Sequence, residues 1–456
     1  MIPYIGTISE KQSYNISVTF ALPNNFSTGE KTDITVIDEN YAIFVPPAGI
    51  THLKIVNDIA PFYLTGTISC IEQVDEFSNF LDNTFLICKI GISINDDEMA
   101  DQVFFHNFFV DNILINNVSG KEVYTFKLIS TDAIIFKGHI PPDKPISTYS
   151  EEGTTKKVDE IINDAFPSDS PNESLKITDE SIGDYLSSID ISYISPINTT
   201  YENAINDILS YINSVGNTLT YLFYNCGNYV AGEDMEEGYS FFNIKKNLGE
   251  YEIKDFNTFK ISNISFMDPF SLHTTKKLSL ISPYENSKIF NLLSSKTKMK
   301  YDFSKNQWVE DSRFLTNNIV DDIKEFNLNG EEAFINKVTP RVESLAYDVL
   351  TPYNKFLYYN EDSFNDCYCK QLREYILNTN VLVIAVQCNF ARRINQLIGL
   401  YFSGGGHEAN SLRAFEGVWV IVKMEFTTDR NSNLLQILYL VRTDRINPEE
   451  LVRKIE

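Results

Sequence analysis

The clearest hydrophobic pattern in the chain is a pair of apolar runs near its end, which together predict a β-hairpin. The runs are 418–426 and 434–441, and a polar turn of Thr, Asp, Asn and Ser residues separates them. Val, Ile, Trp, Phe and Tyr favour a pleated strand, and a polar cluster between two such runs favours a turn. Apolar residues occupy both side-chain phases of the first run, with Val420 on one and Trp419 on the other. The pattern therefore predicts a hairpin that is buried on both faces.

Residues 12–140 have the pattern of a dense β domain. Runs rich in Val, Ile, Phe and Thr recur near 14–22, 33–45, 50–57, 63–71, 84–93, 103–116 and 122–136. Short strands separated by closely spaced polar turns predict a sandwich or a barrel. The proline-rich segment 141–145 should end this domain, because proline cannot donate to a central strand ladder.

Helical periodicity follows this break. One helix is predicted from about residue 156, and a clearer one spans 200–215 with an apolar stripe at helical spacing. Thr199 and Glu202 fit a capping box at its start. A predicted strand at 219–224 completes a small α/β domain over 141–249.

The remaining pattern is strand-like at 252–267, irregular over 268–359 and regular again after 360. The irregular part contains a short strand near 277–281 and possible helices near 316–326 and 331–338. After it the pattern predicts a helix at 363–377, strands at 381–387 and 396–402, the hairpin, and a tail at 446–456.

The irregular part also holds the one basic concentration of the chain. Its members are Lys276, Lys277, Lys288, Lys296, Lys298, Lys300 and Lys305. Two interpretations stay open: a solvated loop, or a contact with an acidic neighbour.

Composition narrows the class of protein. A length of 456 residues predicts two to four domains, and 43% apolar with 13% aromatic residues exclude a disordered chain. The net charge of −24 argues against a general nucleic-acid binder, whose affinity comes from Lys and Arg on phosphates. We expect no signal peptide, no membrane span and no stable membrane binding. The six scattered cysteines indicate buried cytosolic thiols rather than a disulfide framework.

No motif in the sequence indicates catalysis, a cofactor or a metal. The glycine loop 404–407 lies between two predicted strands, whereas a phosphate cradle needs a following helix. Cys367 and Cys369 form a single C-x-C, and the acidic turn 96–101 lacks the Gly and Glu of a calcium loop. We therefore expect a protein that is not an enzyme and has no catalytic, cofactor-binding or metal-binding residues.

The order of these elements resembles that of a known family. The segments concerned follow the N-terminal β region and are TYENAINDILSYINSVGNTLTYLFYN (200–225), SFNDCYCKQLREYILNTN (363–380), VLVIAVQC (381–388), INQLIGLYF (394–402) and GVWVIVKMEFTTDRNSNLLQILYLVR (417–442). This order is similar to that of the central baseplate hub protein of contractile-tailed bacteriophages, which is related to the hub part of type VI secretion spike proteins. The resemblance covers about half of the chain, best at 121–225 and 360–443. The glycine loop 403–415 is longer than in the family, and 268–359 has no counterpart in it.

The resemblance implies a mainly β fold with α+β insertions, in which two tail-tube-like β-barrels accompany smaller α/β domains. The first barrel would be 1–140, and the second would combine 250–267 with 360–445. Between them lie the 141–249 domain and an inserted irregular domain at 268–359. Three chains would form a ring that adapts the sixfold tail tube to the threefold central spike.

Further expectations follow from this resemblance. The partners would be two further copies of the chain, the central spike protein, the tail tube protein, and the tape-measure and baseplate wedge proteins. DNA would only pass through the lumen. The protein would lie in the baseplate of a virion assembled in the host cytoplasm. Trp419, Lys296, Lys298 and Lys300 are the residues expected to contact a subunit or partner.

Two alternatives stay open at this point. A peripheral baseplate or tail-tube component with a related barrel would be present in six or more copies per particle. A tail-associated cell-wall hydrolase would depend on a carboxylate and would clear peptidoglycan. The sequence also leaves open whether the particle is a phage, a bacteriocin or a secretion device.

Overall fold

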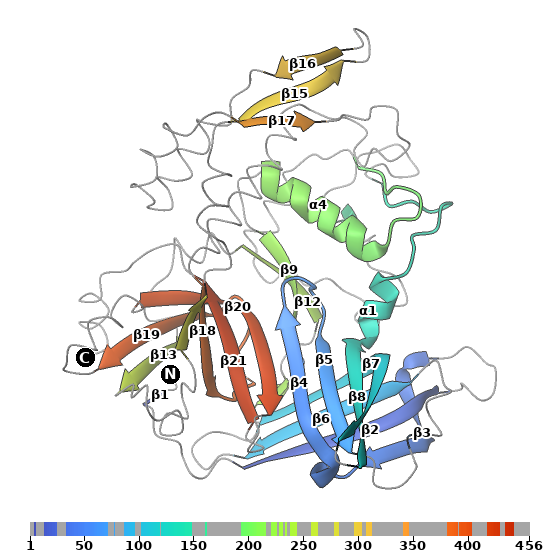
Figure 1. Cartoon of the computed structure of the whole chain (residues 1–456), viewed down its shortest axis with the longest axis vertical. Helices are drawn as coiled ribbons and strands as arrows, with labels where there is room; N and C mark the ends of the chain where they lie inside the picture. Colours follow the sequence, from blue (N-terminus) through green and yellow to red (C-terminus); the bar gives the residue numbers. More distant parts are fainter. Residues whose placement is uncertain are drawn as a thin grey trace.

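A computed structural model describes the chain in segments that cover most of its β regions. The described residues are 4–5, 13–24, 33–71, 77, 86–95, 102–118, 120–147, 160–161, 193–215, 220–225, 228–230, 233–234, 238–243, 257–262, 278–281, 296–302, 307–311, 341–345, 381–390, 392–403, 417–428 and 434–441. Strands dominate them, and the prediction of a mainly β fold is confirmed (Figure 1). The predicted division into two barrels stays a prediction.

The N-terminal region forms antiparallel strands that match the predicted runs. They are β2 (Ser13–Asn24), β3 (Asp33–Val45), β4 (Ile50–Asp58), β5 (Thr65–Ile71), β6 (Ile87–Asn95), β7 (Gln102–Val118) and β8 (Lys121–Ser130), with a short 3-10 turn η1 (Pro47–Gly49) before β4. Their order across the sheet is β4-β5-β8-β7-β6-β2-β3. Side chains alternate in burial along β4, where Leu53, Ile55 and Asn57 face inward. Such alternation places one face of each strand on a common core.

Aromatic rings fill much of this core. The rings of Phe20, Phe77 and Phe126 contact one another, with centroid distances of 5.6 Å (Phe20–Phe77), 4.3 Å (Phe20–Phe126) and 5.5 Å (Phe77–Phe126). Cys70, Cys88 and Cys388 are buried free thiols, as predicted for these three.

One predicted strand is wrong at its end. The run 122–136 was expected to be extended throughout, but α1 (Thr131–Phe136) is helical. Ala133 and Phe136 lie three positions apart and are both buried, and the Phe136 ring packs at 5.2 Å from Phe62. Residues at this spacing share one side of a helix, so this packing favours a helical turn over the local strand preference.

Strands from the second half of the chain join the same sheet. They are β13 (Asn257–Ser262), β14 (Leu278–Ile281), β18 (Val381–Gln387), β19 (Leu397–Ser403), β20 (Gly417–Thr428) and β21 (Leu434–Val441). The N-terminal strand β1 (Tyr4–Ile5) pairs with β13. The predicted hairpin is confirmed as β20–β21. β20 also pairs with β4, and through this contact sixteen of the described strands form one sheet.

A helical unit lies beside this sheet (Figure 1). It contains α4 (Tyr201–Val215) and the paired strands β9 (Thr220–Asn225) and β12 (Gly238–Asn243). The short strands β10 (Asn228–Val230) and β11 (Glu233–Asp234) belong to the main sheet, where β10 pairs with β7. The predicted helix is confirmed, but its cap lies one residue later than predicted. Thr200 Oγ1 accepts from the Asn203 N–H at 3.3 Å, so Thr200 occupies the capping position expected for Thr199. Ile205, Ile208 and Leu209 are buried along one side of it.

A separate three-stranded sheet lies farthest from the main sheet in Figure 1. It consists of β15 (Lys296–Asp302), β16 (Gln307–Asp311) and β17 (Arg341–Leu345). Lys296, Lys298 and Lys300 therefore lie at alternate positions of a strand, so the loop conformation in one of the two open interpretations is wrong for these three residues. The helices predicted at 316–326, 331–338 and 363–377 fall outside the described residues, while Glu160 and Ile161 of the predicted helix near 156 are helical.

Candidate functional site: the junction of the N-terminal and C-terminal strands

The N-terminal strands meet the C-terminal hairpin where β4 pairs with β20. The antiparallel register places Asp58 opposite Lys423. One more hydrogen bond extends the pairing, since the backbone N–H of Leu53 donates to the Thr428 hydroxyl at 2.9 Å across 375 positions of sequence. Ladder bonds satisfy the backbone groups of both strands, so neither strand has an open edge over this length.

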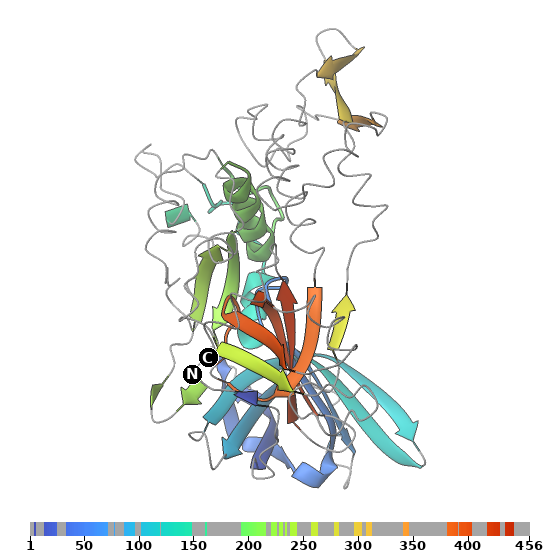
Figure 2. The ribbon, with the colours of Figure 1, turned by 90° about the vertical axis from the view of Figure 1, so that its left-hand side faces the viewer.

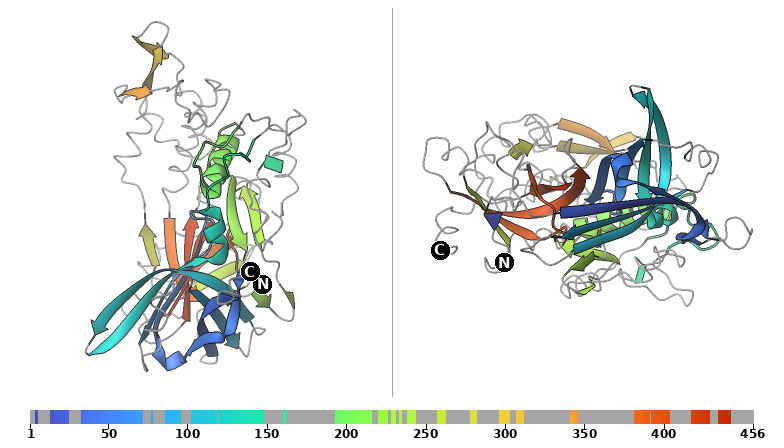
Figure 3. Two further views of the ribbon diagram at one scale, coloured as in Figure 1. Left: turned by 90° about the vertical axis from the view of Figure 1, so that its right-hand side faces the viewer. Right: turned by 90° about the horizontal axis from the view of Figure 1, so that it is seen from below.

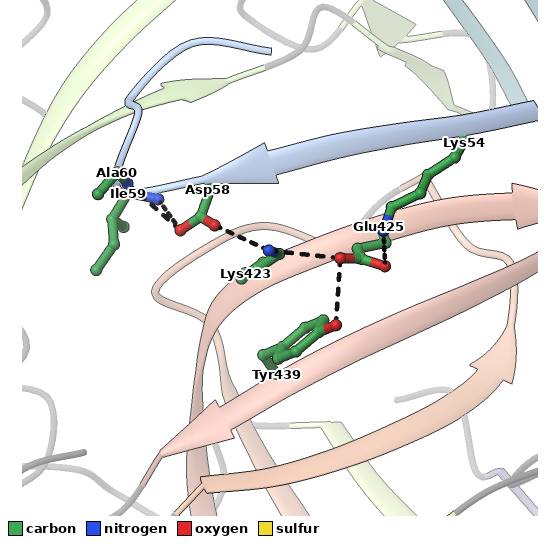
Figure 4. A network of polar contacts seen from close by, with 7 residues as sticks. All are labelled: Lys54, Asp58, Ile59, Ala60, Lys423, Glu425 and Tyr439. Carbon is green, nitrogen blue, oxygen red and sulfur yellow. Dashed lines mark hydrogen bonds and ion pairs between the residues drawn. The ribbon is translucent and has the colours of Figure 1, made fainter. Parts of the chain in front are cut away.

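Four charged side chains and one tyrosine cross the junction as a continuous polar network (Figure 4). Lys423 Nζ lies 3.2 Å from Asp58 Oδ2 and 3.4 Å from Glu425 Oε1. Lys54 Nζ lies 2.9 Å from Glu425 Oε2, and the Tyr439 hydroxyl donates to Glu425 Oε1 at 3.2 Å. Glu425 is thus held by groups from β4, β20 and β21 together.

Asp58 also fixes the end of β4. Its Oδ1 accepts from the backbone N–H of Ile59 at 2.7 Å and from that of Ala60 at 3.3 Å (Figure 4). An aspartate that bonds the backbone just after itself stabilises a turn. The same carboxylate therefore ends the strand and anchors Lys423 of the opposite strand.

Cations and hydrogen-bond donors of the network balance the charge of its buried carboxylate, Glu425. Glu425 is only 4% exposed, and a buried carboxylate is tolerated when cations and hydrogen-bond donors surround it. Burial alone lowers the pKa of Lys423, but the carboxylates of Asp58 and Glu425 outweigh it, and the pKa of this lysine is raised. Burial and the nearby Glu425 raise the pKa of Tyr439. Lys423 is therefore cationic and Tyr439 neutral at neutral pH.

Apolar contacts support the junction from within the sheet. The rings of Phe104, Phe390 and Phe426 form a cluster with centroids 5.2–6.0 Å apart. These rings come from β7, the segment after β18, and β20. The backbone N–H of Phe390 also donates to Gln102 Oε1 at 2.7 Å. N-terminal and C-terminal residues thus share one core as well as one ladder.

Two further polar contacts extend this arrangement. Arg392 donates to Gln436 inside the C-terminal strands, and both side chains are buried. Asn57 Nδ2 of β4 donates to the Tyr224 carbonyl of β9 at 3.0 Å, which attaches the helical unit to the junction. The chemistry available here is that of ion pairs and hydrogen bonds that hold three parts of the chain together.

The structure places the site residues expected from sequence away from this network. Trp419 is fully buried within the chain, so its indole belongs to the core and offers no surface to a partner. Other parts of the same chain cover both faces of β20. Lys296, Lys298 and Lys300 lie in the separate sheet, and their contact with a partner stays a prediction.

Sequence reasoning missed Lys54, Asp58, Lys423 and Glu425. A signal was present, because Lys423 and Glu425 interrupt the apolar run 418–426 at alternate positions. Charged residues in such a run need partners, but only the fold identifies β4 as the source of them.

Other chemical candidates add no second site. No cluster of three or more His, Cys, Asp or Glu suited to a metal occurs among the described residues. His106 is buried beside Ser130 Oγ at 3.0 Å, and burial lowers its pKa to about 3. The glycine loop 404–407, the pair Cys367 and Cys369, and the acidic turn 96–101 fall outside the described residues. Within the part of the chain that is described, no helix is long and apolar enough to cross a membrane.

Comparisons with known proteins found similarity in structure. No family model and no curated protein matches the chain. A tail protein from Neisseria meningitidis is 10% identical, with 94% of this chain and 97% of that chain covered and a TM-score of 0.49. The 43 kDa tail protein of prophage MuSo2 from Shewanella oneidensis is 9% identical over 94% and 98% of the two chains, with a TM-score of 0.46.

A Francisella PdpA–VgrG complex in its half-lidded form is also similar. It is 12% identical over 96% of this chain and 59% of that chain, with a TM-score of 0.47. The structural neighbours thus include tail proteins, the class that the sequence resemblance names. With TM-scores below 0.5, these likenesses assign no role to this chain.

Proposed function

We propose that this chain is a structural component of a phage-like contractile tail, and specifically the baseplate hub. In this role three copies form a ring that adapts the sixfold tail tube to the threefold central spike. The order of elements at 121–225 and 360–443 supports the proposal through its resemblance to hub proteins. The observation that carries it is the junction, where strands from both ends of the chain are built into one sheet.

The junction suits a hub because such a ring must transmit force without coming apart. Each chain would supply one β region from 1–140 and one from 250–267 with 360–445. A trimer would then present six similar β regions around its axis, which matches a sixfold tube, while its own symmetry matches a threefold spike. The buried network around Glu425 would keep the two regions of each chain in a fixed orientation.

The charge of the chain supports the expected passage of DNA. A net charge of −24 gives a lumen few cations to bind phosphates, so DNA would pass without being held. The protein partners under this proposal are the spike, the tail tube, and the tape-measure and wedge proteins.

The test is the mass of the purified protein, measured alone and after mixing with the central spike protein of the same particle. The expected result is a species with three times the mass of one chain that binds one spike trimer. A chain that stays monomeric and binds neither spike nor tube would overturn the proposal. Clearing of peptidoglycan by the purified chain would instead favour a hydrolase.

A further inference from the structure

The outer half of the β7–β8 hairpin leaves the body of the molecule as a two-stranded ribbon. We name this ribbon, residues 111–118 and 120–123, the arm. Figures 2 and 3 show it standing clear of the other described strands. Apart from two half-buried positions, every arm residue is exposed, whereas every second residue in the inner half of β7 is buried.

The arm begins at an irregularity in the strand pairing. The β7–β8 register shifts between Val110 and Asn112, which makes Asp111 an extra residue on β7. An extra residue of this kind bends a strand and increases its twist, so it accounts for the departure of the arm from the sheet. At the tip the Gly120 N–H donates to Asn117 Oδ1 at 3.0 Å, and Gly120 has a φ of +78° that favours glycine.

One edge of the arm is open. β6 pairs with β7 only as far as Phe109, and a last bond joins the Val110 N–H to the Leu86 carbonyl. Beyond that point the described residues pair β7 with β8 alone. The open edge is therefore residues 111–118, a length typical of a complete strand.

Beyond Asp111 at its base, this edge of the arm carries no residue that blocks strand addition. Natural edge strands are commonly blocked by charged residues or proline. The segment 112–118 reads NILINNV and contains neither. Leu114, Ile115 and Val118 are 44%, 49% and 56% exposed, and because Leu114 and Ile115 are consecutive they present apolar surface on both faces.

We propose that the arm binds a second copy of this chain by adding its open edge to β3 of that copy. β3 ends the strand order among the described strands, so its outer edge has no partner among them. Phe44 near the end of β3 is 73% exposed, which gives the arm an apolar neighbour. The inference rests on the homotrimer of the proposed function and names the contact that builds it.

Charge favours a second copy as the occupant. Two chains that each carry −24 repel one another over most of their surfaces. The uncharged segment 112–118 can approach another copy without this repulsion, and the final residues of β3, Ala42-Ile43-Phe44-Val45, are also uncharged. Because the arm and β3 are different surfaces, the contact is head-to-tail, and such contacts form a ring when the rotation between successive copies closes.

The first experiment replaces Ile115 by the photoreactive residue p-benzoylphenylalanine in the full-length chain. Illumination should produce a covalent dimer whose linked peptides join residue 115 of one copy to residues 33–45 of another. The same residue at Ile197, which is 63% exposed on a different part of the chain, is the control and should give at least about tenfold less dimer. Links to another part of a second copy would reject β3 as the receiver.

The second experiment measures the oligomeric state of a variant with Leu114→Ser, Ile115→Ser and Val118→Ser by sedimentation. The expected result is dissociation of the trimer at concentrations at which the unaltered chain and Ile197→Ser stay assembled, with unchanged circular dichroism. A variant that assembles as before overturns the inference but leaves the proposed hub intact. If the unaltered chain is monomeric at all concentrations, both the inferred contact and the proposed hub function are wrong.

Discussion

The β20–β21 hairpin and the arm are both antiparallel ribbons rich in Val, Ile and Leu, yet their surroundings differ. β20 has neighbours on both sides, and its inward and outward side chains are covered by the same chain. The arm has one open edge, and Leu114, Ile115 and Val118 remain accessible. An apolar run in the sequence therefore predicts a surface that is buried in the assembled protein. The topology of the chain decides whether other strands of the same chain bury that surface.

Charged residues also distinguish the two ribbons, and they occur in the covered hairpin rather than in the exposed segment. The covered hairpin contains Lys423 and Glu425, which the partners on β4 neutralise. The exposed segment 112–118 contains no charge at all. Charges in the hairpin fix which strand it pairs with, because a wrong register would leave them buried and unpaired. Their absence from 112–118 leaves this part of the arm's edge free to accept another strand.

The largest effect is expected from placing an unpaired charge inside the covered hairpin. Val420 is fully buried, so Val420→Asp should cost more than about 4 kcal/mol and unfold the C-terminal strands. The control is Ile197→Asp at a position that is 63% exposed and lies outside the proposed contact, which should change the stability by about 0.5 kcal/mol or less. Urea denaturation followed by circular dichroism measures both. Equal effects would show that the hairpin is not covered.

Trp419→Ala should lower the free energy of unfolding by about 3–5 kcal/mol, because it leaves a large cavity in the core. The same urea experiment gives this value, and sedimentation gives the oligomeric state. If assembly is lost while stability is unchanged, Trp419 contacts a partner as the sequence suggested, and its burial within the chain is wrong.

Glu425→Gln removes the carboxylate that joins Lys54, Lys423 and Tyr439. The loss should be about 2–3 kcal/mol, since charge-assisted hydrogen bonds in a buried site contribute at this level. Lys54→Ala is the matched control, because Lys54 is 38% exposed and should cost less than about 1 kcal/mol. Similar losses for both variants would mean that the buried carboxylate has no special role at the junction.

A smaller effect is expected from pH. The pKa of Lys423 is raised in the folded chain, so its contribution is complete below the unfolded pKa of about 10.4 and is lost as the pH rises through the folded pKa. The stability difference between the unaltered chain and Lys423→Met should therefore shrink from pH 8 to pH 12. Urea midpoints at each pH measure it, and a difference that stays constant contradicts the assignment.

The smallest effect on stability is expected in the arm. Replacing Leu114, Ile115 and Val118 together by serine should change the free energy of unfolding by about 1 kcal/mol or less, because these side chains are already exposed. A loss as large as that of Trp419→Ala would show that the chain itself covers the arm, and the contrast between the two hairpins would disappear.

Local patterns in the sequence predicted most strands of the described fold and the α4 helix. Alternating β-branched and aromatic residues are sufficient for β20, β21 and β18, and helical spacing is sufficient for Ile205, Ile208 and Leu209. Sequence reasoning failed at α1, where packing against Phe62 overrides local preference, and at the cap of α4, where Thr199 and Thr200 are equally suited.

The junction could not be predicted from the sequence because its signal is not local. Leu53 and Thr428 are 375 positions apart, and no periodicity connects them. The sequence therefore indicated that the hairpin must be covered on both faces, by its own barrel core and by a neighbouring domain or subunit, and it named Trp419 as a possible contact. In the fold, other strands of the same chain cover the hairpin. The exposed apolar surface lies on the arm instead.

The central claim is that three copies of this chain form the hub of a tail. Its most direct test is the number of copies per purified particle, measured by quantitative mass spectrometry against the tail tube protein as an internal standard. The expected result is three copies of this chain for each six-subunit tube ring that contacts the baseplate. Six or more copies would contradict it and would place the chain in the tube or at the periphery of the baseplate.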